Sequence, residues 1–258
     1  MNISPRIVPE DWTRHPFVAR INRLVSLGSS DLHSLWRLVE TELTVKKRRD
    51  LVVDGYEFRK FCFVESGFAA RYKLLRNGKR QIISFVLPGD IIGLPASFVE
   101  KARYSVIAVT DMKLQACSMN AYVQLCYDRP QFALALAWLA VQEAYLCAEH
   151  TINTGRRTPT ERLAHFLLEM HARLAMVGHA ANASFDLPFS QEVMSDALGL
   201  SVPHLNRTLA KLRADGLIAM DGRHVQLVDV GALELLGNFQ RLELRPIPPA
   251  LSVMGAVA

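Results

Sequence analysis

The 258-residue chain has few cysteines and no spacing that would gather them around a metal ion. Cys62, Cys117, Cys126 and Cys147 lie far apart and form no CxxC pair, which excludes a zinc ribbon and argues against a disulfide framework. We expect four reduced thiols. Cys62 falls in an apolar strand and Cys147 in a packed helix, so both should be inert.

The chain also lacks a long uninterrupted apolar run. The longest, residues 132–147, is broken by Gln142 and Glu143 and is too short to span a bilayer. The first residues, MNISPRIVPEDW, show no basic-then-apolar signal pattern. We therefore expect a cytoplasmic protein without membrane contact.

Motifs for enzyme chemistry are missing as well. We find no activated nucleophile, no metal-ligand spacing and no glycine-rich phosphate loop, so we expect neither an enzyme nor a metal site. Five histidines could ligate haem, but no context selects one of them: His15, His33, His150, His165 and His171. The net charge of +5 and the pI of about 9.1 suit an anionic partner without proving one.

Short β-rich pieces separated by turn signals fill residues 44–118. Asn77-Gly78 between two alternating segments is the strongest hairpin signal in the chain. Regularly spaced short strands favour an antiparallel sandwich, roll or barrel. The expected strands cover residues 51–53, 61–65, 69–75, 81–86, 104–109 and 113–117.

The ends of the chain are harder to interpret. Residues 1–24 form an N-terminal extension that we expect to be loose up to about Pro16. Apolar spacing predicts two short helices within residues 17–43, the second capped by Ser30 or Asp31. Residues 237–258 form a C-terminal tail, expected to be disordered or an arm from Arg245.

A long helix should begin at Pro130 and continue to about Asn153. Its 4-3-4-3-4 apolar spacing is the one that a coiled-coil seam requires, so we expect a homodimer, with the central helix of a monomeric core as the alternative. Small residues line a second stripe beside this seam. The seam residues are Leu134, Trp138, Val141, Tyr145, Ala148 and Ile152.

Residues 190–215, SQEVMSDALGLSVPHLNRTLAKLRAD, predict a helix-turn-helix. Ser190 should cap a first short helix that ends at Gly199, since glycine takes a left-handed conformation without steric cost. Ser201 should cap a second helix with Pro203 in its first turn. A capping box at 158–161 opens an earlier helix, and residues 217–228 predict a hairpin that forms a wing.

In this order of elements the sequence resembles the CRP/FNR family of transcription regulators, over residues 25–236. The resemblance implies an α+β fold: an N-terminal antiparallel β-roll like a cyclic-nucleotide-binding domain (25–128), a long dimerisation helix (129–155) and a C-terminal winged helix-turn-helix (156–236). It further implies a homodimer that binds a pseudo-palindromic site on double-stranded DNA and contacts RNA polymerase.

The resemblance implies DNA-contact residues in the second helix, at 202–215. Arg207 falls where the family commonly reads guanine, and a guanidinium can donate bidentately to guanine O6 and N7. Pro203 stands where the best-known members carry a glutamate that accepts from cytosine, so we expect a related but altered half-site. The full set of expected contacts is Ser190, Gln191, Ser201, Val202, Pro203, His204, Asn206, Arg207, Lys211, Arg213 and Arg223.

A cyclic nucleotide is the alternative that the resemblance raises for the β-roll. Residues 88–94, PGDIIGL, match the turn that opens the family's phosphate cassette, but the ribose-binding glutamate is replaced by Leu94. We expect no cofactor, with a cAMP-dependent regulator as the runner-up. Iron–sulfur sensing would need an N-terminal cysteine cluster, and no cysteine precedes Cys62. A possible effector pocket would comprise Gly89, Asp90, Gly93, Arg103 and Ser105.

Overall fold

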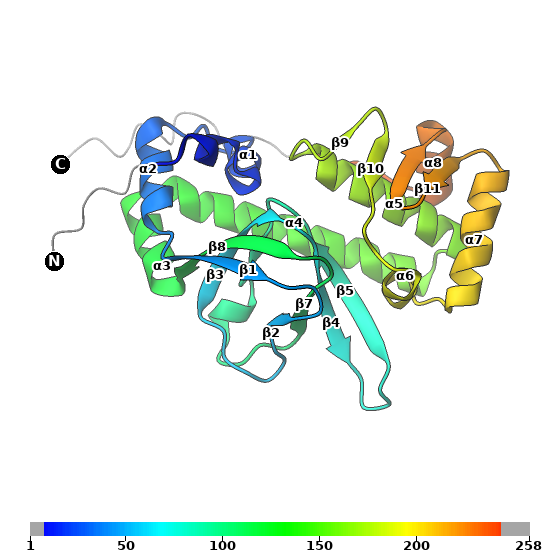
Figure 1. The fold of residues 1–258 in the computed structure, drawn as a ribbon, viewed down its shortest axis with the longest axis horizontal. Coiled ribbons are helices and arrows are strands. Elements are labelled where there is room, and N and C mark those ends of the chain that lie inside the picture. The colour runs from blue at the N-terminus through cyan, green and yellow to red at the C-terminus, as the bar shows by residue number, and fades with distance from the viewer. Residues whose placement is uncertain (1–7, 244–258) are drawn as a thin grey trace.

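The structure is a computed structural model and describes residues 8–243. Two four-stranded antiparallel sheets form a roll, with strand orders β1-β8-β3-β6 and β2-β7-β4-β5 (Figure 1). The six predicted strands are confirmed, while the short edge strands β1 and β6 were not predicted. The strands are β1 (Thr41–Val45), β2 (Asp50–Val52), β3 (Lys60–Ser66), β4 (Ala69–Leu74), β5 (Arg80–Val86), β6 (Ile91–Ile92), β7 (Ser105–Ala108) and β8 (Met112–Ser118), with a 3-10 turn, η2, at Ala96–Phe98.

The β4–β5 hairpin turns at Asn77-Gly78, as predicted, and projects from the roll (Figure 1). Gly78 has a φ of 80°, a backbone conformation that favours glycine, and its N–H donates to the Leu75 carbonyl at 2.9 Å.

The first described residues pack against the roll. A 3-10 turn, η1 (Glu10–Arg14), leads into α1 (Pro16–Asn22) and α2 (Ser29–Arg37). Trp12 is 3% exposed, and Phe17 is fully buried and stacks on Phe63 with ring centroids 4.3 Å apart. The expectation of a loose segment is therefore wrong here, because these aromatic rings bury enough apolar surface to fix it. The expected cap of α2 is also wrong: Gly28 is the N-cap, and the Asp31 carboxylate accepts from its N–H at 3.0 Å.

The long helix α4 (Pro130–Gly155) follows α3 (Met119–Asp128). One side carries Phe132, Ala135 and Leu139, each at most 5% exposed. The opposite side carries apolar residues in contact with solvent, among them Val141, which is 62% exposed. By length and composition α4 could cross a bilayer, but its buried side and its ion pair between Glu143 and Arg71 mark it as a core helix.

The C-terminal part contains α5 (Pro159–Ala175), α6 (Gln191–Leu198), α7 (Val202–Ala214) and α8 (Val230–Gly237), around a sheet of order β11-β12-β10-β9. The strands are β9 (Ala180–Ala181), β10 (Ser184–Asp186), β11 (Ile218–Asp221) and β12 (His224–Leu227). The capping box is confirmed, since Thr158 N–H donates to Glu161 at 2.7 Å. Residues 182 and 183 form a tight turn, because β9 pairs with β10 on either side of them.

The connection between α4 and α5 is held in place by Arg157. Arg157 is 7% exposed and donates to the Glu149 carboxylate at 2.8 Å and to Asn153 at 2.9 Å. The predicted tail from Arg245 lies outside the described residues.

Candidate nucleic-acid interface

The two helices of the motif meet across the predicted glycine turn. The Ser190 hydroxyl accepts from Val193 N–H at 3.3 Å and caps α6. Gly199 ends that helix with φ 64° and ψ 36°, a conformation that few other residues adopt without strain. Leu200 N–H then donates to the Ser195 carbonyl at 3.0 Å, which closes the turn.

The apolar side of α7 anchors it in the domain. Leu205, Leu209 and Leu212 are at most 6% exposed, and the buried Thr208 hydroxyl donates to the His204 carbonyl at 2.9 Å. Ser201 is the N-cap, but its side chain makes no cap hydrogen bond. The hydroxyl is therefore available for a ligand such as a phosphate oxygen.

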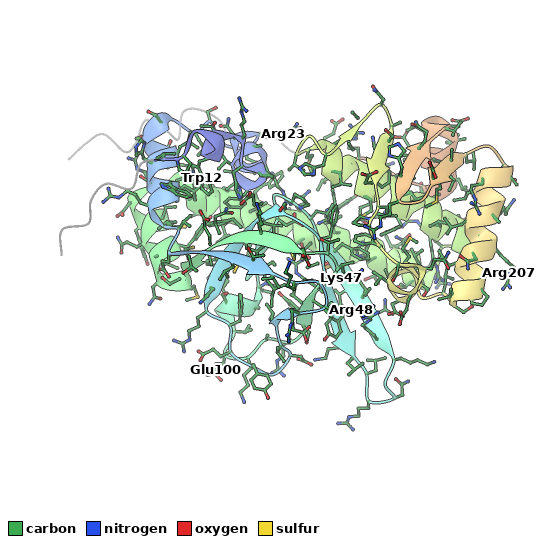
Figure 2. All side chains as sticks on the ribbon, viewed as in Figure 1. Trp12, Arg23, Lys47, Arg48, Glu100 and Arg207 are labelled. Carbon is green, nitrogen blue, oxygen red and sulfur yellow. The ribbon has the colours of Figure 1, made fainter. Side chains whose placement is uncertain are left out.

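The outer side of α7 presents polar side chains to solvent. Arg207 is exposed on α7, which lies at one end of the molecule (Figure 2). The Asn206 side-chain amide donates to the side-chain oxygen Oε1 of Gln191 at 3.1 Å, so the first turn of α6 and the middle of α7 are held in one register. Sequence spacing had not indicated that pairing.

A hollow of about 340 Å³ separates the motif from the wing. Gln191, Asn206 and Arg213 line one part of it, and Gly222 in the β11–β12 turn lines another. Gly222 has a φ of 57° and makes the tight wing turn, with Arg223 exposed beside it. The hairpin predicted for residues 217–228 is therefore confirmed, and its turn lies at Gly222.

The expected contact residues thus lie on one side of the C-terminal domain. Ser190, Gln191, Ser201, Pro203 and Arg223 are exposed there. Val202 and His204 are half-buried, and Lys211 already pairs with Asp215 at 2.9 Å. Exposed guanidinium, amide and hydroxyl donors on a helix and a wing are the groups that contact base edges and phosphates.

The residues of the expected effector pocket have different surroundings. Asp90 is 7% exposed and pairs with Arg20 and, at 2.7 Å, with Arg173. Burial alone would raise the pKa of Asp90, but the two guanidinium groups outweigh burial and hold that pKa below its usual value. A Cβ on Gly93 would lie 2.4 Å from the Lys60 carbonyl oxygen, so this glycine is required by close packing.

Arg103 and Ser105, the other two polar residues of the expected effector pocket, differ in exposure and in hydrogen-bond partners. Arg103 is exposed, and its carbonyl oxygen accepts from Lys73 at 3.0 Å. Ser105 is buried, and its hydroxyl accepts from Asp54 N–H at 3.0 Å. The buried guanidinium inside the roll is that of Arg71, which pairs with Glu143 of α4 and donates to Ser84 at 3.0 Å.

The cysteine and histidine side chains considered above are shaped by burial and by hydrogen bonds within the protein. Burial raises the pKa of Cys62 and Cys117 to about 12 and that of Cys126 to about 11, which disfavours the reactive thiolate. His15 bonds to Gln115 at 2.7 Å, and His150 bridges the Ile83 carbonyl and Glu169. Burial lowers the pKa of His165 and His171. Within residues 8–243, no group of three or more His, Cys, Asp or Glu side chains is placed to hold a metal ion.

Sequence comparisons match both parts of the chain to known domain families. A Crp-like helix-turn-helix domain covers residues 161–236, and a cyclic nucleotide-binding domain covers residues 42–128. The nitrogen fixation regulation protein FixK of Bradyrhizobium diazoefficiens is 31% identical over 193 residues, covering 75% of this chain and 78% of the relative. The transcriptional activatory protein AadR of Rhodopseudomonas palustris is 32% identical over 205 residues, covering 79% and 83%.

Solved structures show the same arrangement. FixK2 from Bradyrhizobium japonicum has a TM-score of 0.69 at 29% identity and covers 76% of this chain and 96% of its own. A CRP-family transcriptional regulator from Thermus thermophilus shares the fold with a TM-score of 0.61 at 23% identity, covering 76% and 97%. With its roll, long helix and winged helix-turn-helix, the chain belongs to the CRP/FNR family and is a DNA-binding transcription regulator.

Proposed function

We propose that the protein binds a pseudo-palindromic promoter site as a homodimer, with one α7 in the major groove of each half-site. The observation that carries this proposal is the exposed Arg207 on a helix whose opposite side is fixed in the core. The capped α6 and the wing flank that helix, so phosphate contacts from both would set its register on DNA.

The exposed side of α4 supports the homodimer. Leu134 is 41% exposed, Val141 62% and Ile152 44%, and exposed alanines at 133, 137, 140 and 144 lie beside them. An apolar face of this length is costly in water and is removed when a second α4 covers it. Trp138 and Tyr145 of the expected seam are half-buried at its edge. A two-fold axis along α4 would place the two α7 helices about one DNA turn apart.

The names of relatives support a proposal for how this protein acts on transcription. Relatives such as AadR and FnrL are named transcriptional activators, and we propose activation by contact with RNA polymerase, in the cytoplasm. We assign no enzymatic activity to the chain.

We infer that DNA binding does not require a cyclic nucleotide. Leu94 offers no acceptor for a ribose hydroxyl, Asp90 is already neutralised by two arginines, and Arg103 points to solvent rather than into the roll's interior. A polar ligand buried against leucine would lose a hydrogen bond worth about 1–3 kcal/mol. Saturating cAMP should therefore leave DNA affinity unchanged, whereas a several-fold gain in affinity would overturn this inference.

The function is tested by selecting bound duplexes from a random DNA library with the purified full chain and no added ligand. We expect enrichment of an inverted repeat whose half-sites are one helical turn apart and contain a guanine for Arg207. A selected pool without an inverted repeat would contradict the proposal. Repeating the selection with Arg207→Ala provides the matched comparison.

A further inference from the structure

A cavity of about 370 Å³ lies where α1, α4 and α5 meet the segment that follows α8. Its volume falls in the range of small-molecule binding sites. Its lining residues come from α1 and the residues that follow it, from the long helix α4, from α5 and from residues 239–242, and none comes from α7. Its polar lining comprises Arg20, Arg23, Gln142, Glu169, Arg173, Gln240 and Arg241.

One buried N–H donor in the lining, on Arg20, has no hydrogen-bond partner among residues 8–243. The Arg20 side chain is 9% exposed, and its two terminal nitrogens donate to Gly89, Asp90 and Gln142. Its Nε is buried and has no hydrogen-bond partner within the described part of the chain. Buried polar groups are nearly always hydrogen-bonded, so an acceptor that enters the cavity would satisfy this one.

The charge of the lining favours an anion. Four guanidinium groups face one carboxylate, Glu169. Arg173 is engaged by Glu169 and Asp90, and Arg20 by Asp90. Arg23, at the end of α1 (Figure 2), and Arg241 are exposed, and neither forms an ion pair with any side chain that the structure describes. Arg23 and Arg241 therefore place two positive charges at this cavity that no described carboxylate pairs with.

The remaining walls are apolar. Leu24, Trp138, Tyr145, Leu146 and Met176 line the cavity, and the Tyr145 hydroxyl donates to the Gln240 carbonyl at 3.5 Å. Such walls suit an aromatic or aliphatic body, while the arginines suit a carboxylate, sulfonate or phosphate group.

We propose that this cavity is an effector site for a small organic anion with an apolar body. The ligand would contact α1, packed on the roll, and α5 of the winged helix at the same time. Arg173 on α5 also donates to the Phe85 carbonyl at 2.8 Å, so a ligand at Arg173 acts on the junction between roll and DNA-binding domain. A ligand that binds two arrangements of this junction unequally shifts their populations.

The probe for testing this site is 8-anilinonaphthalene-1-sulfonate, an aromatic anion that fits the cavity. Trp138 lines the cavity and can transfer excitation to the bound probe, so binding is followed by sensitised emission of the full chain. Ala172→Phe fills the cavity from α5. Arg23→Gln removes a positive charge from the exposed edge of the cavity and leaves the cavity's volume nearly unchanged. Arg37→Gln removes the same charge from an exposed position on α2 and serves as the control.

We expect one probe per chain, with Kd raised about tenfold or more by Ala172→Phe and about threefold by Arg23→Gln, and unchanged by Arg37→Gln. Unchanged binding to both Ala172→Phe and Arg23→Gln, or no binding to the wild type, would overturn the proposal. Arg23→Gln keeps the test valid should Ala172→Phe not fold. The measurement uses no DNA, so its failure would leave the DNA-binding proposal untouched.

Discussion

Pro203 is the second residue of α7 and is exposed, so it is not part of the core. Proline is tolerated there because the first N–H groups of a helix have no intrahelical partner. It offers a base edge no hydrogen bond, which removes one source of discrimination that a glutamate would supply.

Replacing Pro203 with glutamate should therefore change specificity and leave the fold intact. Pro203→Glu places a carboxylate in the first turn of α7, where the helix dipole favours negative charge. In the library selection we expect a new cytosine preference at one base pair per half-site, worth about 1–3 kcal/mol. An unchanged selected site, with a melting temperature equal to that of the wild type, would show that residue 203 does not face a base.

His150 lies on α4, and its ring bonds the Glu169 carboxylate of α5 at 2.8 Å. Burial opposes its protonation, but Glu169 and the Ile83 carbonyl outweigh burial and raise its pKa from 6.5 to about 8. The folded state therefore holds this proton more tightly than the unfolded chain. The resulting stabilisation is present below pH 6.5 and is lost as the pH rises through about 8.

Urea unfolding of wild type and His150→Gln at pH 6 and pH 8.5 measures this contribution. The difference between the two proteins in free energy of unfolding should shrink by about 2 kcal/mol at the higher pH. Comparing the two proteins removes the contributions of His165 and His171, whose lowered pKa values act in the opposite direction. A difference that is the same at both pH values would show that the His150–Glu169 pair does not hold the proton.

Helix α4 has two sides with different partners. Leu139 and Leu146 are buried on one side, and the other side bears Val141 and the alanine stripe. A sequence with apolar residues on most of its circumference requires both a core and a second partner.

Val141→Glu places a charge at the centre of the proposed dimer face. Because symmetry brings two such carboxylates together in an apolar contact, we expect the dimer Kd to rise at least about 100-fold. Sedimentation should then show monomers, and circular dichroism should show that these monomers retain their helical content. Leu235→Glu is the control, since Leu235 is 86% exposed on α8 and lies outside the α4 face. Equal dimerisation of the two variants would place the dimer interface elsewhere.

Buried charges join the parts of the molecule. Asp90, after the roll's fifth strand, pairs with Arg20 of α1 and Arg173 of α5, and Arg173 also pairs with Glu169 at 3.2 Å. Removing one member of such a cluster leaves uncompensated charges in the interior.

Asp90→Asn should therefore lower the free energy of unfolding by about 3–5 kcal/mol, measured in urea. Asp215→Asn, which breaks the exposed pair with Lys211, should cost only about 0.3–0.5 kcal/mol. A loss at Asp90 as small as that at Asp215 would mean that solvent reaches the cluster.

The sequence predicted most of the architecture because its signals are local. Asn77-Gly78, the Thr158 capping box and Gly199 each specify a backbone conformation within a few residues, and the structure has all three. The order of strand-rich segment, long helix and helix-turn-helix was read from these local signals, and the resemblance to the family followed from that order.

Contacts between distant segments could not be predicted in this way. The cluster of Arg20, Asp90 and Arg173 joins residues up to 153 positions apart. The cavity beside it is lined by residues that are even farther apart in the sequence, from Arg20 to Leu242. The same limit applies to the hairpin, where Arg80 pairs with Asp196 of α6 at 2.6 Å. Periodicity and turn chemistry carry no information about such pairings.

The most direct test of the central claim compares wild type and Arg207→Ala on the selected inverted repeat and on a scrambled duplex, by fluorescence anisotropy at one fixed salt concentration. We predict that Arg207→Ala weakens binding to the repeat by about 1–3 kcal/mol per half-site and binding to the scrambled duplex far less. Arg37→Ala, at the other end of the molecule, should bind both as the wild type does. Equal affinity of Arg207→Ala and wild type for the repeat would contradict readout through α7.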